Sequence, residues 1–121
     1  MRFPVDFPQG CPDNDAVQAN GTYYRIVRGD SLSEADFMSY HELGKLPNAT
    51  PCRRVGVSLY NSRKAALHML SLQRFLGRAI AEGRLSPSSG KTKLTNPVSG
   101  HVCWWPFEDV VRHRLFSDPQ P

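Results

Sequence analysis

Apolar and polar positions alternate along three stretches of the chain, at residues 22–27, 54–60 and 101–105. A period of two residues is typical of β-strands that bury one face. Two further stretches, residues 31–43 and 63–77, combine capping residues with helically spaced apolar positions. The pattern therefore predicts strands and helices that follow one another along the chain.

Capping residues mark the ends of the first predicted helix. Ser31 with Glu34 forms a capping-box pattern, and Ser33 with Asp36 offers the same pattern in a second register. Gly44 is a typical residue just beyond a last helical turn. The helix is therefore predicted to lie between these signals.

Three other segments are less regular. Residues 75–85 fit a continued helix or a strand that follows a break at Gly77, and the strand is favoured. Residues 86–99 are rich in turn-forming residues and predict a mobile loop. Residues 107–116 predict a helix or a short strand.

The chain divides into an arm and a body. Residues 1–20 are rich in proline, glycine, aspartate and asparagine and predict an irregular arm, whereas residues 22–116 predict a globular body. A length of 121 residues suits one domain. The element order predicts an α+β fold, in which a mixed or antiparallel sheet of four to five strands packs with two to three helices.

Positive charge is spread along the sequence. The formal net charge is +4, and the basic residues lie far apart, for example at positions 53–54, 63–64 and 112–114. Nucleic-acid modules more often gather their positive charge on one element. The charge therefore favours a cationic soluble surface over nucleic-acid binding.

The three cysteines, Cys11, Cys52 and Cys103, are widely spaced. Because no CxxC pair is present, no metal site is predicted. An odd number is most simply explained by a reducing compartment, where thiols stay unpaired. The first residues lack the apolar core of a signal peptide and no segment has the length of a membrane span, so a cytoplasmic location is expected.

The last predicted strand has two different faces. His101, Cys103 and Trp105 share one face, and Val102 and Trp104 share the other. One tryptophan is therefore expected in the core, and Trp105 is expected to wall the face that carries His101. Cys103 is predicted to be a buried apolar residue, because neighbours two apart on a strand have little freedom to meet as nucleophile and base.

Five residues on predicted strands are candidates for a ligand site: Arg25, Ser58, Tyr60, His101 and Trp105. A guanidinium group binds phosphate or carboxylate in a fork, and aromatic rings stack on bases. If these side chains line one cleft, they suit a nucleotide or another small anionic ligand. The alternative is a half-exposed sheet face that carries mixed polar residues.

Four short motifs carry a resemblance. They are Tyr24-Arg25-Ile26, Asp36-Phe37-x-Ser39, Gly56-Val57-Ser58-x-Tyr60 and Gly100-His101-x-x-Trp104-Trp105-Pro106. Over residues 22–107 this arrangement resembles a group of uncharacterised small bacterial proteins. That resemblance implies a shared small fold and no established activity.

More distantly, the first and second strands are similar to those of ADP-ribosyltransferase-like folds. The resemblance implies that Arg25 holds the phosphates of NAD and that Ser58 supports the pocket of the nicotinamide ribose. The catalytic glutamate of those enzymes has no clear match, and Glu82 and Glu108 are the candidates.

These observations predict a small cytoplasmic bacterial protein that acts as a ligand-binding or protein-interaction module, such as the cargo of a mobile element. The expected partner is a small anionic ligand or another protein, with no membrane and no cofactor. An ADP-ribosyltransferase-like or NAD-processing enzyme, with NAD as its cofactor, is the alternative. Nucleic-acid binding is a second alternative. Phe3, Val5 and Phe7 alternate in the arm, which fits an edge strand or a strap on the body, and a sheet with such an edge suggests a homodimer.

Overall fold

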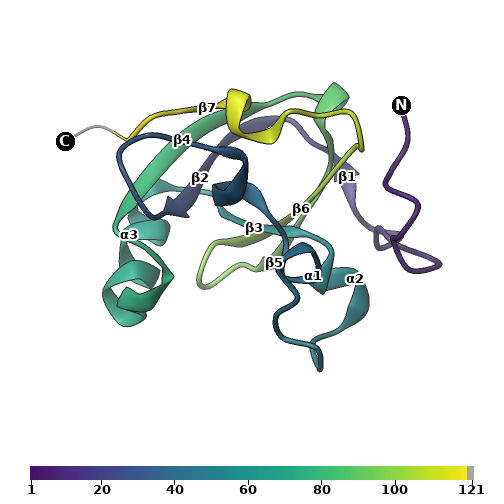
Figure 1. Cartoon of the computed structure of the whole chain (residues 1–121), viewed down its shortest axis with the longest axis horizontal. Helices are drawn as coiled ribbons and strands as arrows, with labels where there is room; N and C mark the ends of the chain where they lie inside the picture. The colour runs from purple at the N-terminus through teal and green to yellow at the C-terminus, as the bar shows by residue number, and fades with distance from the viewer. Residues whose placement is uncertain (120–121) are drawn as a thin grey trace.

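The computed structural model describes residues 1–119, and seven strands in this part of the chain form one antiparallel sheet (Figure 1). The strands follow the order β1-β5-β6-β3-β2-β4-β7 across the sheet. Their bounds are β1 Val17–Gln18, β2 Gly21–Val27, β3 Val57–Tyr60, β4 Ala79–Leu85, β5 Gly90–Asn96, β6 His101–Pro106 and β7 Phe116–Ser117. The α+β class is confirmed, but the predicted number of four to five strands is too low.

Within residues 1–119, three short α-helices lie outside the sheet: α1 Tyr40–Leu43, α2 Pro51–Arg54 and α3 Arg63–Leu72. The helix predicted over residues 31–43 is instead a 3-10 turn, Glu34–Phe37, followed by α1. Each piece has its own capping box. Ser33 and Asp36 cap the 3-10 turn, which is the second register predicted above, and Ser39 and Glu42 cap α1. Gly44 ends α1 with a left-handed backbone, as predicted.

The main core lies on the inner face of the curved sheet. Alternating residues of the central strands meet there, among them Leu59, Val102 and Trp104, none of them more than 3% exposed. Phe116 of β7 packs against Trp104 at a ring-centroid distance of 6.2 Å. Because β6 and β7 are far apart in the strand order, this contact shows that the sheet curls around its core.

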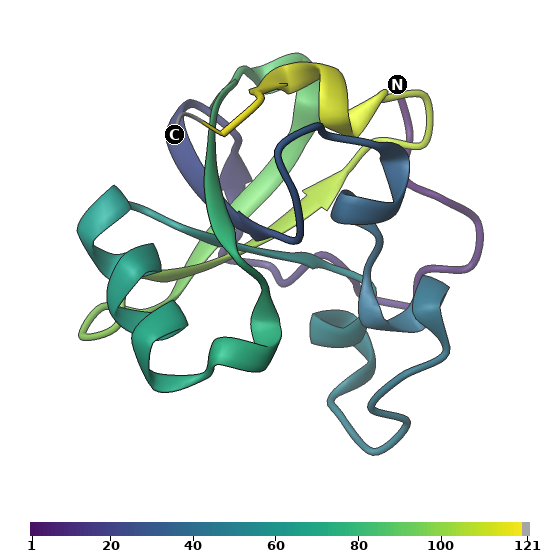
Figure 2. The same cartoon turned by 60° about the vertical axis from the view of Figure 1, so that its left-hand side comes forward.

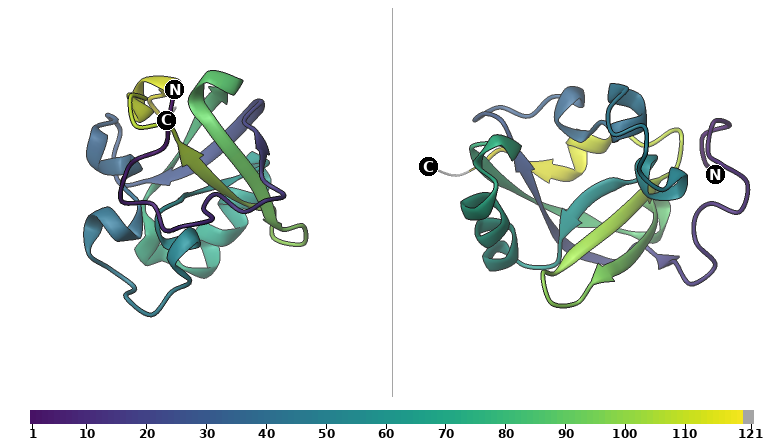
Figure 3. Two further views of the ribbon diagram at one scale, coloured as in Figure 1. Left: turned by 90° about the vertical axis from the view of Figure 1, so that its right-hand side faces the viewer. Right: turned by 90° about the horizontal axis from the view of Figure 1, so that it is seen from below.

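Two smaller apolar clusters lie on the outer face. Helix α3 covers the first with Ala66, which packs with Ile26 of β2 and Tyr60 of β3. The N-terminal arm covers the second, where Phe3 and Phe7 are among the residues that pack against a centre formed by Val55, Cys103 and Trp105. Figure 3 shows the arm passing along the end of the sheet beside α2.

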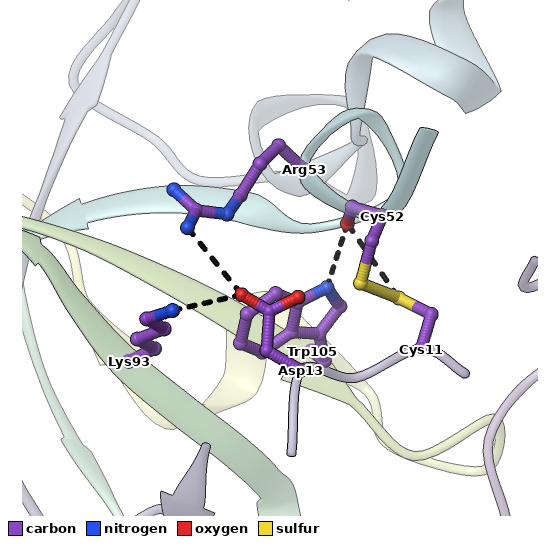
Figure 4. The surroundings of a disulfide bond; sticks show 6 residues. All are labelled: Cys11, Asp13, Cys52, Arg53, Lys93 and Trp105. Atoms are coloured by element: carbon purple, nitrogen blue, oxygen red, sulfur yellow. Dashed lines mark hydrogen bonds and ion pairs between the residues drawn. A yellow bond between two sulfur atoms is a disulfide. The ribbon is translucent and has the colours of Figure 1, made fainter. Parts of the chain in front are cut away.

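A disulfide joins the arm to α2, between Cys11 and Cys52 (Figure 4). Beside it, Asp13 accepts a hydrogen bond from Lys93 at 3.0 Å and lies 3.4 Å from the guanidinium of Arg53. The expectation of three unpaired thiols is therefore wrong, because the fold brings together two cysteines that are 41 residues apart. The odd cysteine count no longer supports the expected location.

Two of the three less regular segments have different outcomes. The strand favoured within residues 75–85 is confirmed as β4. The helix predicted to reach Gly77 is shorter than expected, since α3 ends at Leu72 and a 3-10 turn covers Arg74–Leu76. The loop predicted over residues 86–99 is wrong, because its centre is β5, which pairs with β6 and with the short β1. Lys91, Lys93 and Thr95 occupy half-buried positions of this strand, which tolerate polar side chains.

The predicted segment 107–116 consists of a 3-10 turn, Arg112–Leu115, that leads into β7. No helix within residues 1–119 combines the length and the apolar character needed to cross a membrane.

Candidate functional site

A cavity of about 650 Å³ lies against strands β2, β3 and β6 of the sheet. One side is formed by the 3-10 turn Glu34–Phe37, by α1 and by the loop that follows it, and the other by α3 and the turn after it. Figure 2 shows these two helical groups standing on either side of the central strands. Cavities of this size hold small-molecule ligands in many proteins.

The floor of the cavity is where β2 and β3 separate. These neighbouring strands share a single ladder pair, Tyr24 with Tyr60. Beyond that pair no further backbone ladder joins β2 to β3. The side chain of Arg25 connects the two strands instead, since its Nη1 donates to the carbonyl of Ser58 at 2.8 Å. Its Nε donates to the carbonyl of Asp36 at 2.9 Å and so holds the neighbouring 3-10 turn.

Arg25 is a partly buried cation that makes no ion pair with any residue in the range 1–119. Burial lowers the pKa of its guanidinium, and Tyr40, Asp36 and Tyr60 nearby act against that shift. A guanidinium has five N–H donors and stays protonated at neutral pH, so two carbonyl bonds leave donors for a further acceptor. Buried charges are ordinarily paired, and this one faces a cavity.

Ser58 and His101 form a hydrogen-bonded pair beside Arg25. Ser58 of β3 lies opposite Cys103 of β6, so His101 is its diagonal neighbour on the same face. His101 Nε2 lies 3.0 Å from Ser58 Oγ, and Thr95 Oγ1 of β5 is in contact with the other ring nitrogen, Nδ1. Tyr60 packs edge-on against the imidazole at 5.6 Å.

Burial shifts the pKa values of two of these side chains. The pKa of His101 falls below its usual value because burial, and then Arg53 and Arg25, disfavour the imidazolium. The pKa of Tyr60 rises, chiefly through burial. At neutral pH the cavity therefore presents a neutral imidazole, a neutral phenol and one partly buried guanidinium.

The mouth of the cavity is apolar and its charged rim is basic. Phe75, Leu46 and Leu43 line it, and they are 73%, 52% and 42% exposed. Arg28 and Lys45 add positive charge to the lining. The carboxylate of Asp36 is already hydrogen-bonded to the backbone N–H of Ser33 at 2.9 Å. This combination suits a ligand with one anionic group and one apolar part.

The structure brings together four of the five candidates, Arg25, Ser58, Tyr60 and His101. Trp105 does not line the cavity: although it shares a strand face with His101, it is fully buried beneath the arm. Its indole N–H donates to the carbonyl of Cys52 at 2.8 Å.

Neither glutamate named as a catalytic candidate lines the cavity. Glu82 lies on β4, where it is exposed and 3.4 Å from Arg63. Glu108 follows β6 and pairs with Arg2. Cys103 is buried, as predicted, and burial raises the pKa of its thiol to about 12.

Sequence reasoning missed several residues of the site. Thr95 lies in a segment predicted as a mobile loop, and Tyr40 and Leu43 lie in a predicted helix to which no site role was assigned. Leu46 lies beyond that helix, in a segment without a pattern. Phe75 was assigned to an ambiguous helix. Only the alternation of Thr92, Leu94 and their polar neighbours hinted at the missing strand.

Comparisons of the chain with protein families, with curated proteins and with solved structures find no match. Within residues 1–119 no cluster of three or more His, Cys, Asp or Glu side chains could hold a metal ion. The chemistry of the site must therefore be argued from its own side chains.

Proposed function

We propose that the protein binds a small organic anion in the cavity between α1 and α3. The charged group of the ligand pairs with Arg25, and its apolar part lies against Leu43, Leu46 and Phe75. The observation that carries the proposal is the partly buried guanidinium that faces the cavity without a carboxylate partner in residues 1–119. Arg is well suited to this role because it binds phosphate or carboxylate with two parallel hydrogen bonds.

Isothermal titration with three matched probes tests this proposal. Phenyl phosphate carries both an anionic and an apolar part, inorganic phosphate lacks the apolar part, and phenol lacks the charge. We expect phenyl phosphate to bind most tightly, and Arg25→Gln to weaken it by about tenfold or more, the usual effect of losing a hydrogen bond to a charged group. Arg84→Gln is the matched control, since Arg84 is an exposed arginine of β4 outside the cavity lining.

Arg25 also supports two backbone carbonyls, so Arg25→Gln could alter the fold. Tyr60→Phe removes only a hydroxyl at the floor of the same cavity, and circular dichroism reports whether each variant is folded. Binding of phenyl phosphate that is equally tight in wild type and in folded Arg25→Gln contradicts the proposal.

The NAD-processing alternative keeps one supporting observation. Arg25 and Ser58, the two residues that the distant resemblance associates with NAD, are joined by a 2.8 Å hydrogen bond. The site nevertheless has no free carboxylate among its lining residues to act as the catalytic glutamate. Incubation of labelled NAD with wild type and with Arg25→Ala tests this alternative, which predicts binding or turnover only in wild type.

Nucleic-acid binding, a protein partner, a homodimer and a mobile-element role remain predictions of the sequence. Retention on DNA or RNA that weakens steeply with salt would support the first of them.

A further inference from the structure

The hydrogen bonds around His101 determine which ring nitrogen carries the proton and therefore which atom donates in the contact with Ser58. The carbonyl of His101 can only accept a hydrogen bond, so the hydroxyl of Thr95, 3.1 Å away, donates to it. Thr95 Oγ1 is then free to accept the proton on His101 Nδ1. The lone pair of the neutral imidazole therefore lies on Nε2, where it accepts the hydroxyl proton of Ser58.

Three strands hold this arrangement in place. Ser58 is on β3, His101 opens β6 and Thr95 is near the end of β5. Within residues 1–119, Ser58 Oγ has His101 as its only hydrogen-bond partner. A hydroxyl bonded to a base that a third group orients is the general signature of an activated nucleophile.

We propose that Ser58 is a nucleophile that cleaves small carboxylic esters in this cavity, with His101 as its general base and Thr95 as a positioning residue. Ser58 Oγ adds to the ester carbonyl carbon while its proton moves to His101 Nε2. The carbon–oxygen bond to the leaving alcohol breaks, and the alcohol takes that proton. Water then adds to the acyl group and gives one proton to His101, which returns it to Ser58 as the carboxylic acid leaves.

The substrate class follows from the lining of the cavity. The ester oxygen becomes negatively charged in the tetrahedral intermediate, and the product is a carboxylate. Arg25, which is bonded to the carbonyl of Ser58 itself, is the cation placed to face this charge. The apolar mouth suits an aliphatic or aromatic substituent. This inference rests on the proposed anion site only through that role of Arg25.

A fluorophosphonate tests the nucleophile directly, because it phosphonylates an activated serine hydroxyl and releases fluoride. We expect one adduct on wild type, located at Ser58 by peptide mass spectrometry, and no adduct on Ser58→Ala. His101→Gln should slow labelling by about a hundredfold, within the range for loss of a general base. Ser71→Ala is the matched control, since Ser71 is an exposed serine of α3, and should label like wild type.

Hydrolysis of 4-nitrophenyl butyrate gives the second readout. Its rate should decrease as the pH falls through the pKa of His101, which lies below the usual value. Thr95→Val should lower kcat and shift this pH profile with little change in KM, and Thr95→Ser should restore both. A substitution that acts only by unfolding the protein would instead reduce the circular dichroism signal.

The possible results are distinct. An adduct absent from folded wild type, or located at a residue other than Ser58, overturns the nucleophile. If phenyl phosphate binds while no adduct forms, only this inference fails. If the adduct forms at Ser58 while no anion binds, the inference stands and the proposed anion site fails.

Discussion

At the scale of single residues, close packing between β3 and β6 leaves no room for a side chain at Gly56. Gly56 precedes β3 and lines the cavity. A Cβ atom at this position would lie 2.2 Å from Cys103 Sγ and 3.3 Å from Trp105 Nε1. The absence of a side chain at Gly56 therefore lets β3 pass close to β6 where both tryptophans are buried.

Gly56→Ala is expected to destabilise the protein by about 1–3 kcal/mol, the usual cost of an overpacked interior. Cys103→Ala removes the atom that the new methyl group meets, so the double variant should be more stable than the sum of the two single changes predicts. Urea unfolding followed by tryptophan fluorescence measures the free energy of unfolding of the two single variants and of the double variant. Gly29→Ala is the control, because a Cβ atom there meets nothing within 4 Å; strictly additive effects would contradict the argument.

At the scale of elements, the disulfide and a group of charged residues tie the arm to the sheet. Cys11 is joined to α2, and Asp13, two residues further along the arm, pairs with Lys93 of β5 and Arg53 of α2. The arm in turn covers Trp105. Residues without regular secondary structure thus complete one of the apolar clusters.

Loss of the disulfide should lower the free energy of unfolding by about 4 kcal/mol according to the loop-entropy relation for a separation of 41 residues. The double variant Cys11→Ser/Cys52→Ser should show this loss in urea unfolding. Dithiothreitol should destabilise wild type and Cys103→Ser, which keeps the bridge, and leave the double variant unchanged. Equal responses of all three proteins to the reductant would contradict the assignment.

At the scale of the whole molecule, several shifted pKa values make stability depend on pH in the same direction. The hydrogen bond from Lys93 is the largest cause of the lowered pKa of Asp13. Burial would raise the pKa of Glu42, but hydrogen bonds from Arg112 and the Ser39 backbone lower it overall. His101 also has a lowered pKa, chiefly through burial.

A group whose folded-state pKa is lowered stabilises the protein above its unfolded-state pKa, and that stabilisation disappears as the pH falls through the folded-state value. The midpoint of urea unfolding should therefore decrease first below about pH 6.5, where unfolded His101 becomes protonated. It should decrease further below about pH 4.5, where unfolded carboxylates become protonated. Glu42→Gln should reduce the decrease of the midpoint below about pH 4.5, and His101→Gln should reduce the decrease below about pH 6.5.

Alkaline pH should also destabilise the fold. Burial raises the pKa of Cys103 to about 12, so the stabilisation is complete below its unfolded-state value of 9.0 and is lost as the pH rises toward 12. Cys103→Ala should reduce this alkaline decrease, as measured by the same unfolding midpoints. A midpoint that rises continuously from pH 7 to pH 11 in wild type would contradict the prediction.

Features of the fold that depend on neighbouring residues could be predicted from the sequence, whereas features that depend on contacts between distant residues could not. Alternation correctly predicted β2, β3 and β6, and local signals correctly predicted that α3 begins at Arg63 and that α1 ends before Gly44. The sequence left the cap of α3 open between Asn61 and Ser62, and the structure assigns it to Ser62. Strand β5 escaped prediction because its polar residues become a strand only through pairing with β6. The pairing of Cys11 with Cys52 likewise depends on where the arm crosses α2.

The sequence by itself determined which side chains share a strand face, because the period of a strand is a property of the backbone. It thereby placed Ser58 with Tyr60, and His101 with Cys103. Only the tertiary structure decided that β3 lies beside β6, that β2 separates from β3 at Arg25, and that Thr95 reaches His101. These relations depend on strand order and register, which arise from packing between residues far apart in the chain.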